Sequence, residues 1–325
     1  MSSNKLFNYF IESYCIKKDE EYLNNFCCCR KCCLEKIDYL VKKYNLDYEH
    51  INHKKFFSLE NSIDKRIISE IGVSGNLLRT IISHYLTFNK FDMRDEELFN
   101  FYLKGYTVIS NCLPTKIFHS IKEKLIDSVN ISKKEDPIEH KDIDINFSFD
   151  SNTKIGSFLN KITKNTPSEV KIKGLLIRNN QRKWRKGNVQ EYHSDRYNPC
   201  FKGFVYMSDT SVSNAAFEYL PGSSVLTEEI VNFYYEWFNY IFKLTELPDK
   251  GVPTLMYEWI HRGNKYNDKD LNEKLSTLKL PSIVKLELSE NSVIFANTWG
   301  WHRRGKLEDD KERLTLNINI DCNYI

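Results

Sequence analysis

Two short segments, far apart in the sequence, carry the side chains that could do chemistry. The first is the run EYHSD at 191–195, and the second contains His302. His193 and Asp195 are two positions apart, which on an extended strand places both side chains on the same face. An imidazole and a carboxylate placed in this way can bind one metal ion. His302 is the predicted third ligand, because it follows the apolar, strand-like run 292–297.

Two histidines and one carboxylate on one face of a metal are the ligand set of non-haem Fe(II) oxygenases. Three coordination positions then stay open for a co-substrate and oxygen. Isolated histidines are more often hydrogen-bonded structural residues than ligands, and the chain has eight. His119, His140 and His261 are interpreted in that way, whereas the joint pattern favours metal binding by His193 and His302.

Further motifs follow the first pair in order, and together they resemble the phytanoyl-CoA dioxygenase family of Fe(II)/2-oxoglutarate-dependent oxygenases. That family has His-x-Asp, an apolar strand, an Asn-Gly/Ala turn, a Pro-Gly-Ser segment, a distal His and an Arg. The matching residues are His193 and Asp195, the strand 203–207, Asn214-Ala215-Ala216, Pro221-Gly222-Ser223, His302 and Arg313. Arg313 lies 11 positions after His302, the usual offset in that family. The run 105–110 resembles the family's first element, so the resemblance covers residues 105–320.

The resemblance implies a reaction and its cofactors. Fe(II) would be held by His193, Asp195 and His302, with 2-oxoglutarate chelating the iron through its keto oxygen and C1 carboxylate. O2 would take the remaining position, and oxidative decarboxylation would release succinate and CO2 while a small-molecule substrate is hydroxylated. In related halogenases a small residue replaces the carboxylate. The presence of Asp195 therefore favours hydroxylation, or another oxidation such as desaturation.

The distal carboxylate of 2-oxoglutarate needs a basic partner, and Arg313 is the predicted one. A planar guanidinium binds a carboxylate through two hydrogen bonds, which a lysine cannot match. Thr315 shares a face of the same predicted strand and could add a hydroxyl. Where the family often has a serine, this chain has Arg304, which is predicted to help bind the co-substrate, to meet a substrate anion or to form a salt bridge at the rim. In the alternative interpretation, Arg313 is a surface arginine after the acidic turn 308–310.

Arginines and aromatic residues next to the predicted metal-binding strands could line a pocket for an anionic or sugar-like molecule with apolar parts. They are Arg178, Arg182, Trp184, Arg185, Tyr197, Trp299 and Trp301. Aromatic residues beside strands more often belong to the core, and the run 182–186 is alternatively a solvated loop. The substrate itself is not named by the sequence.

The composition limits the class of protein. The 325 residues are 41% hydrophobic and 28% charged, with a formal net charge of +3. Such a balanced charge argues against a dedicated nucleic-acid binder. The first residues do not have the pattern of a signal peptide, and no run approaches the length of a membrane span. These features predict a cytoplasmic protein and leave its oligomeric state open.

Residues 1–95 have no counterpart in the family and are predicted to form a helical extension. Five of the nine cysteines lie there, at Cys27, Cys28, Cys29, Cys32 and Cys33. The C-x-x-C spacing within this cluster can begin a zinc site or a redox pair, but the second half of such a site is missing. Free thiols in a reducing compartment are the favoured interpretation.

Residues 96–325 predict an α+β domain. A helix is predicted at 116–129, behind Pro114, and an exposed loop at 132–144. Alternating strands, typical of a sheet with one buried face, are predicted at 170–179, 189–195, 201–208, 217–220, 283–288, 292–297 and 313–320. A helical insertion separates two of them at about 225–280. This order favours a double-stranded β-helix, the jelly-roll or cupin-like arrangement, with flanking helices.

Two other function classes stay open at this point. One is a non-catalytic regulatory protein that binds a metal or 2-oxoglutarate, with the cysteine-rich segment taking part in signalling. The other is an oxygenase that modifies a protein, for which residues 1–95 would be the docking part.

Overall fold

The computed structural model describes most of the predicted catalytic domain. The described residues are 75–88, 91–130, 138–141, 149–163, 168–178, 192–195, 200–227, 229–236, 265–266, 272–273, 277–308 and 311–322. The cysteine cluster and most of the predicted extension 1–95 lie outside these ranges, as does most of the predicted insertion 225–280.

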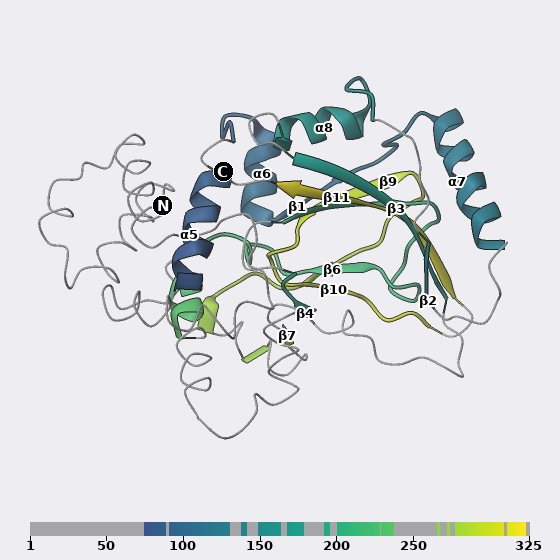
Figure 1. Cartoon of the computed structure of the whole chain (residues 1–325). Coiled ribbons are helices and arrows are strands. Elements are labelled where there is room, and N and C mark those ends of the chain that lie inside the picture. Colours follow the sequence, from purple (N-terminus) through teal and green to yellow (C-terminus); the bar gives the residue numbers. More distant parts are fainter. Residues whose placement is uncertain are drawn as a thin grey trace, which may run out of the picture.

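Two antiparallel β-sheets form the centre of the described structure (Figure 1). The larger sheet has the strand order β1-β9-β5-β11-β3-β2, and the smaller one has the order β7-β4-β10-β6-β8. The larger sheet consists of β1 (Tyr106–Ile109), β2 (Ile138–Lys141), β3 (Ser168–Arg178), β5 (Phe201–Tyr206), β9 (Ser292–Asn297) and β11 (Glu312–Cys322). The smaller sheet consists of β4 (Tyr192–His193), β6 (Phe217–Tyr219), β7 (Lys265–Tyr266), β8 (Val284–Leu286) and β10 (His302–Arg304).

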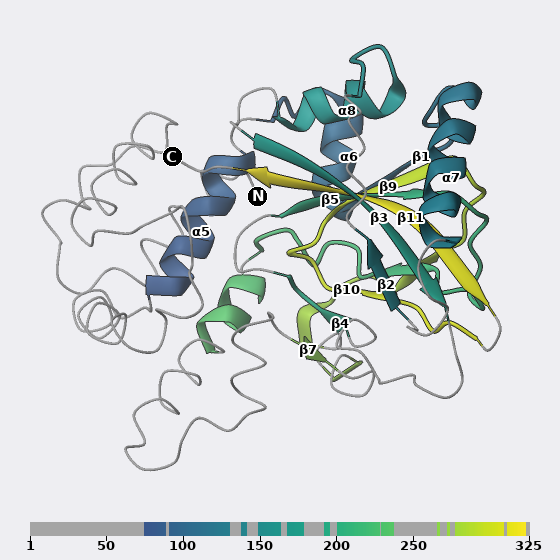
Figure 2. The same cartoon turned by 45° about the vertical axis from the view of Figure 1, so that its right-hand side comes forward.

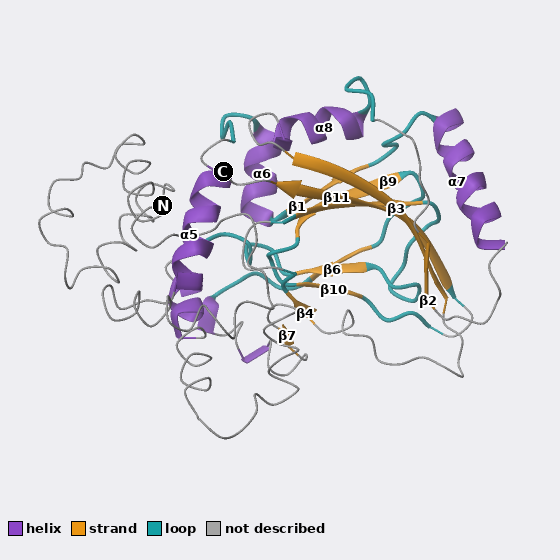
Figure 3. Cartoon of the chain, in the orientation of Figure 1, coloured by secondary structure: helices purple, strands orange, loops and turns teal. Residues whose placement is uncertain are grey.

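Helices cover the face of the larger sheet that points away from the smaller one (Figures 2 and 3). They are α6 (Glu96–Lys104), α7 (Thr115–Asn130) and α8 (Lys154–Thr163), while α5 (Gly75–Phe88) lies at the side. The two ends of helix α6 are fixed by capping residues. The side chain of Asp95 accepts hydrogen bonds from the first turn, and Gly105, with φ of 82°, ends the helix in the left-handed conformation.

The alternation of side chains in the larger sheet separates a helix-facing core from an inner face. On β11, Leu314, Leu316, Ile318 and Ile320 pack in the cluster that includes the helices, whereas the intervening residues point toward the smaller sheet. All six residues of β9 are buried. The prediction of a sheet with one buried face is therefore wrong for β9, because helices cover one of its faces and the smaller sheet covers the other.

Most predicted elements lie where the sequence placed them. The predicted helix 116–129 is α7, and the predicted strands at 201–208, 217–220 and 292–297 contain β5, β6 and β9. The predicted loop 132–144 is wrong in part, because β2 pairs with β3 inside it. Strand β10 and helix α8 were not predicted. β10 is short and polar, whereas α8 follows Thr153, whose Oγ1 accepts a hydrogen bond from the N–H of Gly156, a capping signal that the sequence analysis did not use. The division of the chain at residue 95 and the insertion 225–280 stay predictions.

Antiparallel sheets with helices agree with the predicted α+β class. Within the residues described, no helix has the length and apolarity needed to cross a lipid bilayer.

Candidate metal centre

The smaller sheet brings the two predicted histidine ligands together. Strands β4 and β10 are antiparallel neighbours, and His193 and His302 are direct cross-strand partners. Such partners project from the same face of a sheet. Their ring centroids are 4.5 Å apart, and the two residues are only 8% and 5% exposed. Residues 109 positions apart in the sequence thus lie side by side.

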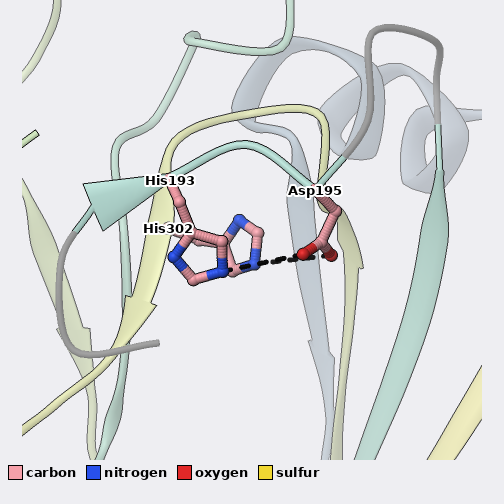
Figure 4. A group of neighbouring side chains, drawn as sticks. All are labelled: His193, Asp195 and His302. Atoms are coloured by element: carbon pink, nitrogen blue, oxygen red, sulfur yellow. Dashed lines mark ion pairs between the residues drawn. The ribbon is translucent and has the colours of Figure 1, made fainter. Parts of the chain in front are cut away.

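Asp195 completes the group from the turn that follows β4. Its backbone N–H donates to the carbonyl of Thr298, 2.9 Å away, which ties this turn to the segment before β10. The carboxylate faces both imidazoles (Figure 4), with 3.6 Å from Oδ1 to Nε2 of His193 and 3.7 Å from Oδ2 to Nε2 of His302.

The three ligand atoms lie within 4.8 Å of one another, and the donors are of the kinds that bind a divalent metal. Nitrogen and oxygen donors bound to one ion at about 2 Å must themselves lie within about 4 Å of each other, so a small adjustment brings this set onto a metal. A carboxylate and two imidazoles also leave three of the six positions of an octahedral ion to other ligands.

A second contact fixes the ring of His302 in the orientation that a ligand needs. Its Nδ1 lies 2.9 Å from the carbonyl oxygen of Gly300, so the Nδ1–H donates there and the Nε2 lone pair points to the group. Burial, reinforced by the neighbouring His193, lowers the pKa of His302 to about 3, which keeps that lone pair available. Gly300 allows this turn, because a side chain would collide with the hydroxyl of Tyr219.

An ammonium group that the sequence analysis did not single out also reaches the centre. Nζ of Lys202, on β5, lies 2.7 Å from Oδ2 of Asp195. Burial alone would raise the pKa of the Asp195 carboxyl, but Lys202 and the two histidines hold it well below its usual range. The alternation of β5 was the available signal, because Lys202 shares the inner face with Phe204 and Tyr206.

Behind the histidines, on the other face of the smaller sheet, a buried carboxylate connects the two ligand strands to a third. Glu218 on β6 accepts a 2.5 Å hydrogen bond from the hydroxyl of Tyr192 on β4 and a 2.9 Å bond from Nε of Arg303 on β10. The Arg303 guanidinium also lies over the ring of Tyr192, 4.2 Å from its centroid. Tyr192 and Arg303 each adjoin a histidine of the centre.

Arg313 lies on the inner face of β11 and is 6% exposed, so it is not a surface residue. Nη1 donates to the carbonyl of Ala215, and the guanidinium carbon lies 5.8 Å from the ring centroid of Tyr206. Ala215 adopts a positive φ of 66° in the predicted Asn-Ala-Ala turn. Nε of Arg313 is buried and has no hydrogen-bond partner among the described residues, so a donor remains for an anion.

The other two residues predicted for the co-substrate lie near Arg313. Thr315 is 1% exposed and shares the inner face, but its hydroxyl makes long contacts with Leu175 and Asn317, of 3.4 and 3.2 Å. Arg304 is half-buried on β10, and burial together with the charge of Arg313 lowers its pKa to about 10. The guanidinium groups of Arg304 and Arg313 therefore lie close enough to repel each other. An anion bound between them would reduce this repulsion.

The residues predicted to contact substrate are only partly within the described ranges. Trp299 and Trp301 are fully buried: the ring of Trp299 packs against His84 at 3.9 Å and Tyr234 at 5.2 Å, and Trp301 packs against Phe233. The backbone of Arg178 pairs with Glu312 at the start of the β3–β11 ladder. Arg182, Trp184, Arg185 and Tyr197 lie outside the described residues. Substrate contact by any of these seven stays a prediction.

No protein-family model matches the sequence, and neither does any curated protein. Among solved structures, the fold is similar to the non-haem α-ketoglutarate-dependent epimerase SnoN from nogalamycin biosynthesis, with 11% identity and a TM-score of 0.41 over 70% of this chain and 82% of that one. HygX from Streptomyces hygroscopicus with nickel and 2-oxoglutarate bound gives 14% identity and a TM-score of 0.42 over 71% and 88% of the chains. AviO1 from Streptomyces viridochromogenes Tue57 gives 14% and 0.41 over 70% and 94%. At such low sequence identity and TM-score, the function has to be argued from the residues of the site.

Proposed function

We propose that this protein is an Fe(II)- and 2-oxoglutarate-dependent dioxygenase that hydroxylates a small molecule and releases succinate and CO2. The observation that carries the proposal is the convergence of His193, Asp195 and His302, whose ligand atoms lie within 4.8 Å of one another. The buried guanidinium of Arg313 supports it, because a dicarboxylic co-substrate needs a cation at its far end. A relation to the phytanoyl-CoA dioxygenase family belongs to the same proposal.

The strand order supports a double-stranded β-helix as the scaffold. From β3 to β6 the chain passes from one sheet to the other at every strand, and it does so again from β8 to β11. Strands that alternate between two facing sheets wind into a jelly roll. The inner faces of both sheets then surround the site, which explains how His302 and Arg313 come to share one interior.

Each residue has a definite part in the proposed reaction. The two imidazoles and the Asp195 carboxylate hold iron, which when bound with 2-oxoglutarate supplies the oxidising power for a C–H bond. Arg313 fixes the distal carboxylate of 2-oxoglutarate, and Arg304 adds positive charge beside it. Gly300 holds His302 in its metal-binding tautomer, and the apolar interior around Phe217 and Tyr219 excludes water.

The test is a coupled assay of the purified chain with Fe(II), 2-oxoglutarate and oxygen. The wild type should release succinate, slowly without substrate and faster with it. His193→Ala removes one of three protein ligands and should reduce succinate release at least 100-fold, whereas His119→Ala, on the exposed side of α7, should leave it unchanged. Unchanged succinate release by His193→Ala would rule the proposal out.

A further inference from the structure

A cavity of about 260 Å3 adjoins the metal centre on the side of the larger sheet, and its wall includes Asp195, Lys171, Asn319 and Lys202. The last three come from β3, β11 and β5, which are neighbours in the larger sheet in the order β5-β11-β3 and are labelled in Figure 2. In the sheet register Asn319 is paired with Lys171 on one side and with Lys202 on the other. All three side chains therefore project from the same face of the larger sheet.

That face is the one directed at the metal centre. Lys202 fixes the direction, because its ammonium reaches Asp195 at 2.7 Å. The alternation along β11 gives the same result, since Asn319 has the parity of Arg313 and Thr315 and not that of the helix-facing leucines and isoleucines. A molecule in the cavity would thus lie between the two lysines and the residues that hold the metal.

The described wall of the cavity carries two lysines and one carboxylate. Among the described wall residues, Asp195 is the single acid, and the proposed function assigns its negative charge to iron. Two ammonium groups and the amide of Asn319 then face the cavity. Such a wall complements an anion that carries two charges, because each lysine acts as a point charge and the amide adds a directed hydrogen bond.

This cationic group is distinct from the one proposed for the co-substrate. Asn319 lies six residues beyond Arg313 on the same strand, which corresponds to about 20 Å along the strand. One 2-oxoglutarate molecule cannot occupy both places. The cavity is also smaller than about 300 Å3, the lower end for sites that enclose a whole drug-sized ligand, so it suits one charged end of a molecule.

We propose that the Lys171–Asn319–Lys202 group binds a phosphate ester on the substrate and thereby positions the neighbouring carbon at the metal centre. This inference rests on the proposed function and adds a substrate class to it. A phosphate monoester matches the two ammonium groups in charge, whereas a carboxylate offers half of that charge.

Binding to the full-length protein tests the inference without knowledge of the substrate. The chain is loaded with Zn(II), which has no redox chemistry, and with 2-oxoglutarate, and is titrated calorimetrically with inorganic phosphate and with acetate. Phosphate should bind at least tenfold more tightly than acetate. Lys171→Ala should raise the phosphate Kd at least tenfold and leave the 2-oxoglutarate Kd unchanged. Lys171→Arg should restore most of the phosphate affinity, and Lys116→Ala, on the exposed side of α7, is the matched control.

The outcomes separate the inference from the proposed function. Equal phosphate affinity in wild type and Lys171→Ala, or equal affinity for phosphate and acetate, would overturn the inference. Displacement of 2-oxoglutarate by phosphate would also overturn it, since phosphate would then occupy the Arg313 end. If 2-oxoglutarate does not bind while phosphate binding still depends on Lys171, the proposed function is wrong and the anion site is upheld.

Discussion

The two sheets hold their residues in place by different means. In the larger sheet, β3 and β11 pair continuously from Arg178 and Glu312 to Ser168 and Cys322, and helices pack on the outer face. The strands of the smaller sheet are only two or three residues long, although β4 and β10 carry both histidines of the proposed metal centre. Short strands contribute few backbone hydrogen bonds, so side chains and turns must fix the ligands.

The contacts of the smaller sheet agree with this difference. Glu218 joins its three central strands through Tyr192 and Arg303. The backbone of Asp195 is bound to Thr298, and the imidazole of His302 to Gly300. We infer that global stability resides mainly in the larger sheet and its helices, whereas the geometry of the metal centre depends on side-chain contacts in the smaller one. Substitutions in the two regions should therefore have separable effects.

The largest effect on stability is expected from Phe295→Ala. Phe295 is fully buried on the helix-facing side of β9 and packs against Phe158 of α8 at 4.8 Å. Its truncation leaves a cavity and should lower the free energy of unfolding by about 3–5 kcal/mol. Denaturant unfolding measures this loss, and Phe99→Ala, at a 42% exposed position on α6, should change it by less than about 0.5 kcal/mol.

The same variant also tests the separation between the sheets. The folded fraction of Phe295→Ala should bind a divalent metal with the affinity of the wild type. A metal affinity that fell in parallel with stability would show that the proposed metal centre depends on the helix-facing core. It would contradict the inference that contacts within the smaller sheet fix the geometry of this centre.

A smaller loss of stability but a clear loss of metal affinity is expected from Glu218→Gln. Glutamine keeps the shape but removes the charge that Arg303 requires, so the alignment of β4 and β10 weakens. We expect a metal affinity at least tenfold lower, in the range found when residues that orient metal ligands are changed, and about 1–3 kcal/mol less stability. Metal titration checks the first effect and denaturant unfolding the second.

A matched variant distinguishes positioning from general destabilisation. Phe158→Leu, in the helix layer, should cost about the same stability as Glu218→Gln without changing metal affinity. If both variants lose metal affinity equally, Glu218 has no special part in holding the ligand strands.

The smallest effect is expected from Asp95→Ala at the start of α6. Asp95 caps the helix through the N–H groups of Glu97 and Leu98 and lies 2.8 Å from Nζ of Lys161. Loss of the cap should lower the free energy of unfolding by about 1 kcal/mol, with no change in metal affinity. Asp95→Asn keeps a capping side chain and should cost less.

The contact between Asp95 and Lys161 also predicts how the difference in stability between the wild type and Asp95→Asn depends on pH. The hydrogen bond with Lys161 lowers the pKa of Asp95 below its unfolded value. A carboxyl with a lowered pKa contributes stability above its unfolded pKa of about 4 and loses that contribution as pH falls through the folded value. The two proteins should differ at pH 7 and converge in acid, and a constant difference would show that the charge is irrelevant.

The spacing of residues along the sequence was enough to predict which neighbouring side chains lie on the same face of a strand. The alternation of β11 put Arg313 and Thr315 on a common face. The two-residue step from His193 to Asp195 indicated a common site, although β4 ends at His193 and Asp195 lies in the turn that follows it. The strands β5, β6 and β9 could be located because apolar residues alternate or run together there. The roles of these residues in metal and co-substrate binding stay proposals.

The tertiary structure alone decided which distant residues meet. The pairing of His193 with His302, the approach of Lys202 to Asp195 and the position of Glu218 behind the histidines all depend on strand order and register, which no single segment encodes. Strand β10 was missed because three polar residues carry no period, and it forms because β4 and β6 offer it backbone partners on both sides. The sequence by itself determined the kinds of donor and their order; the closure of two sheets around a common interior determined that they face one another.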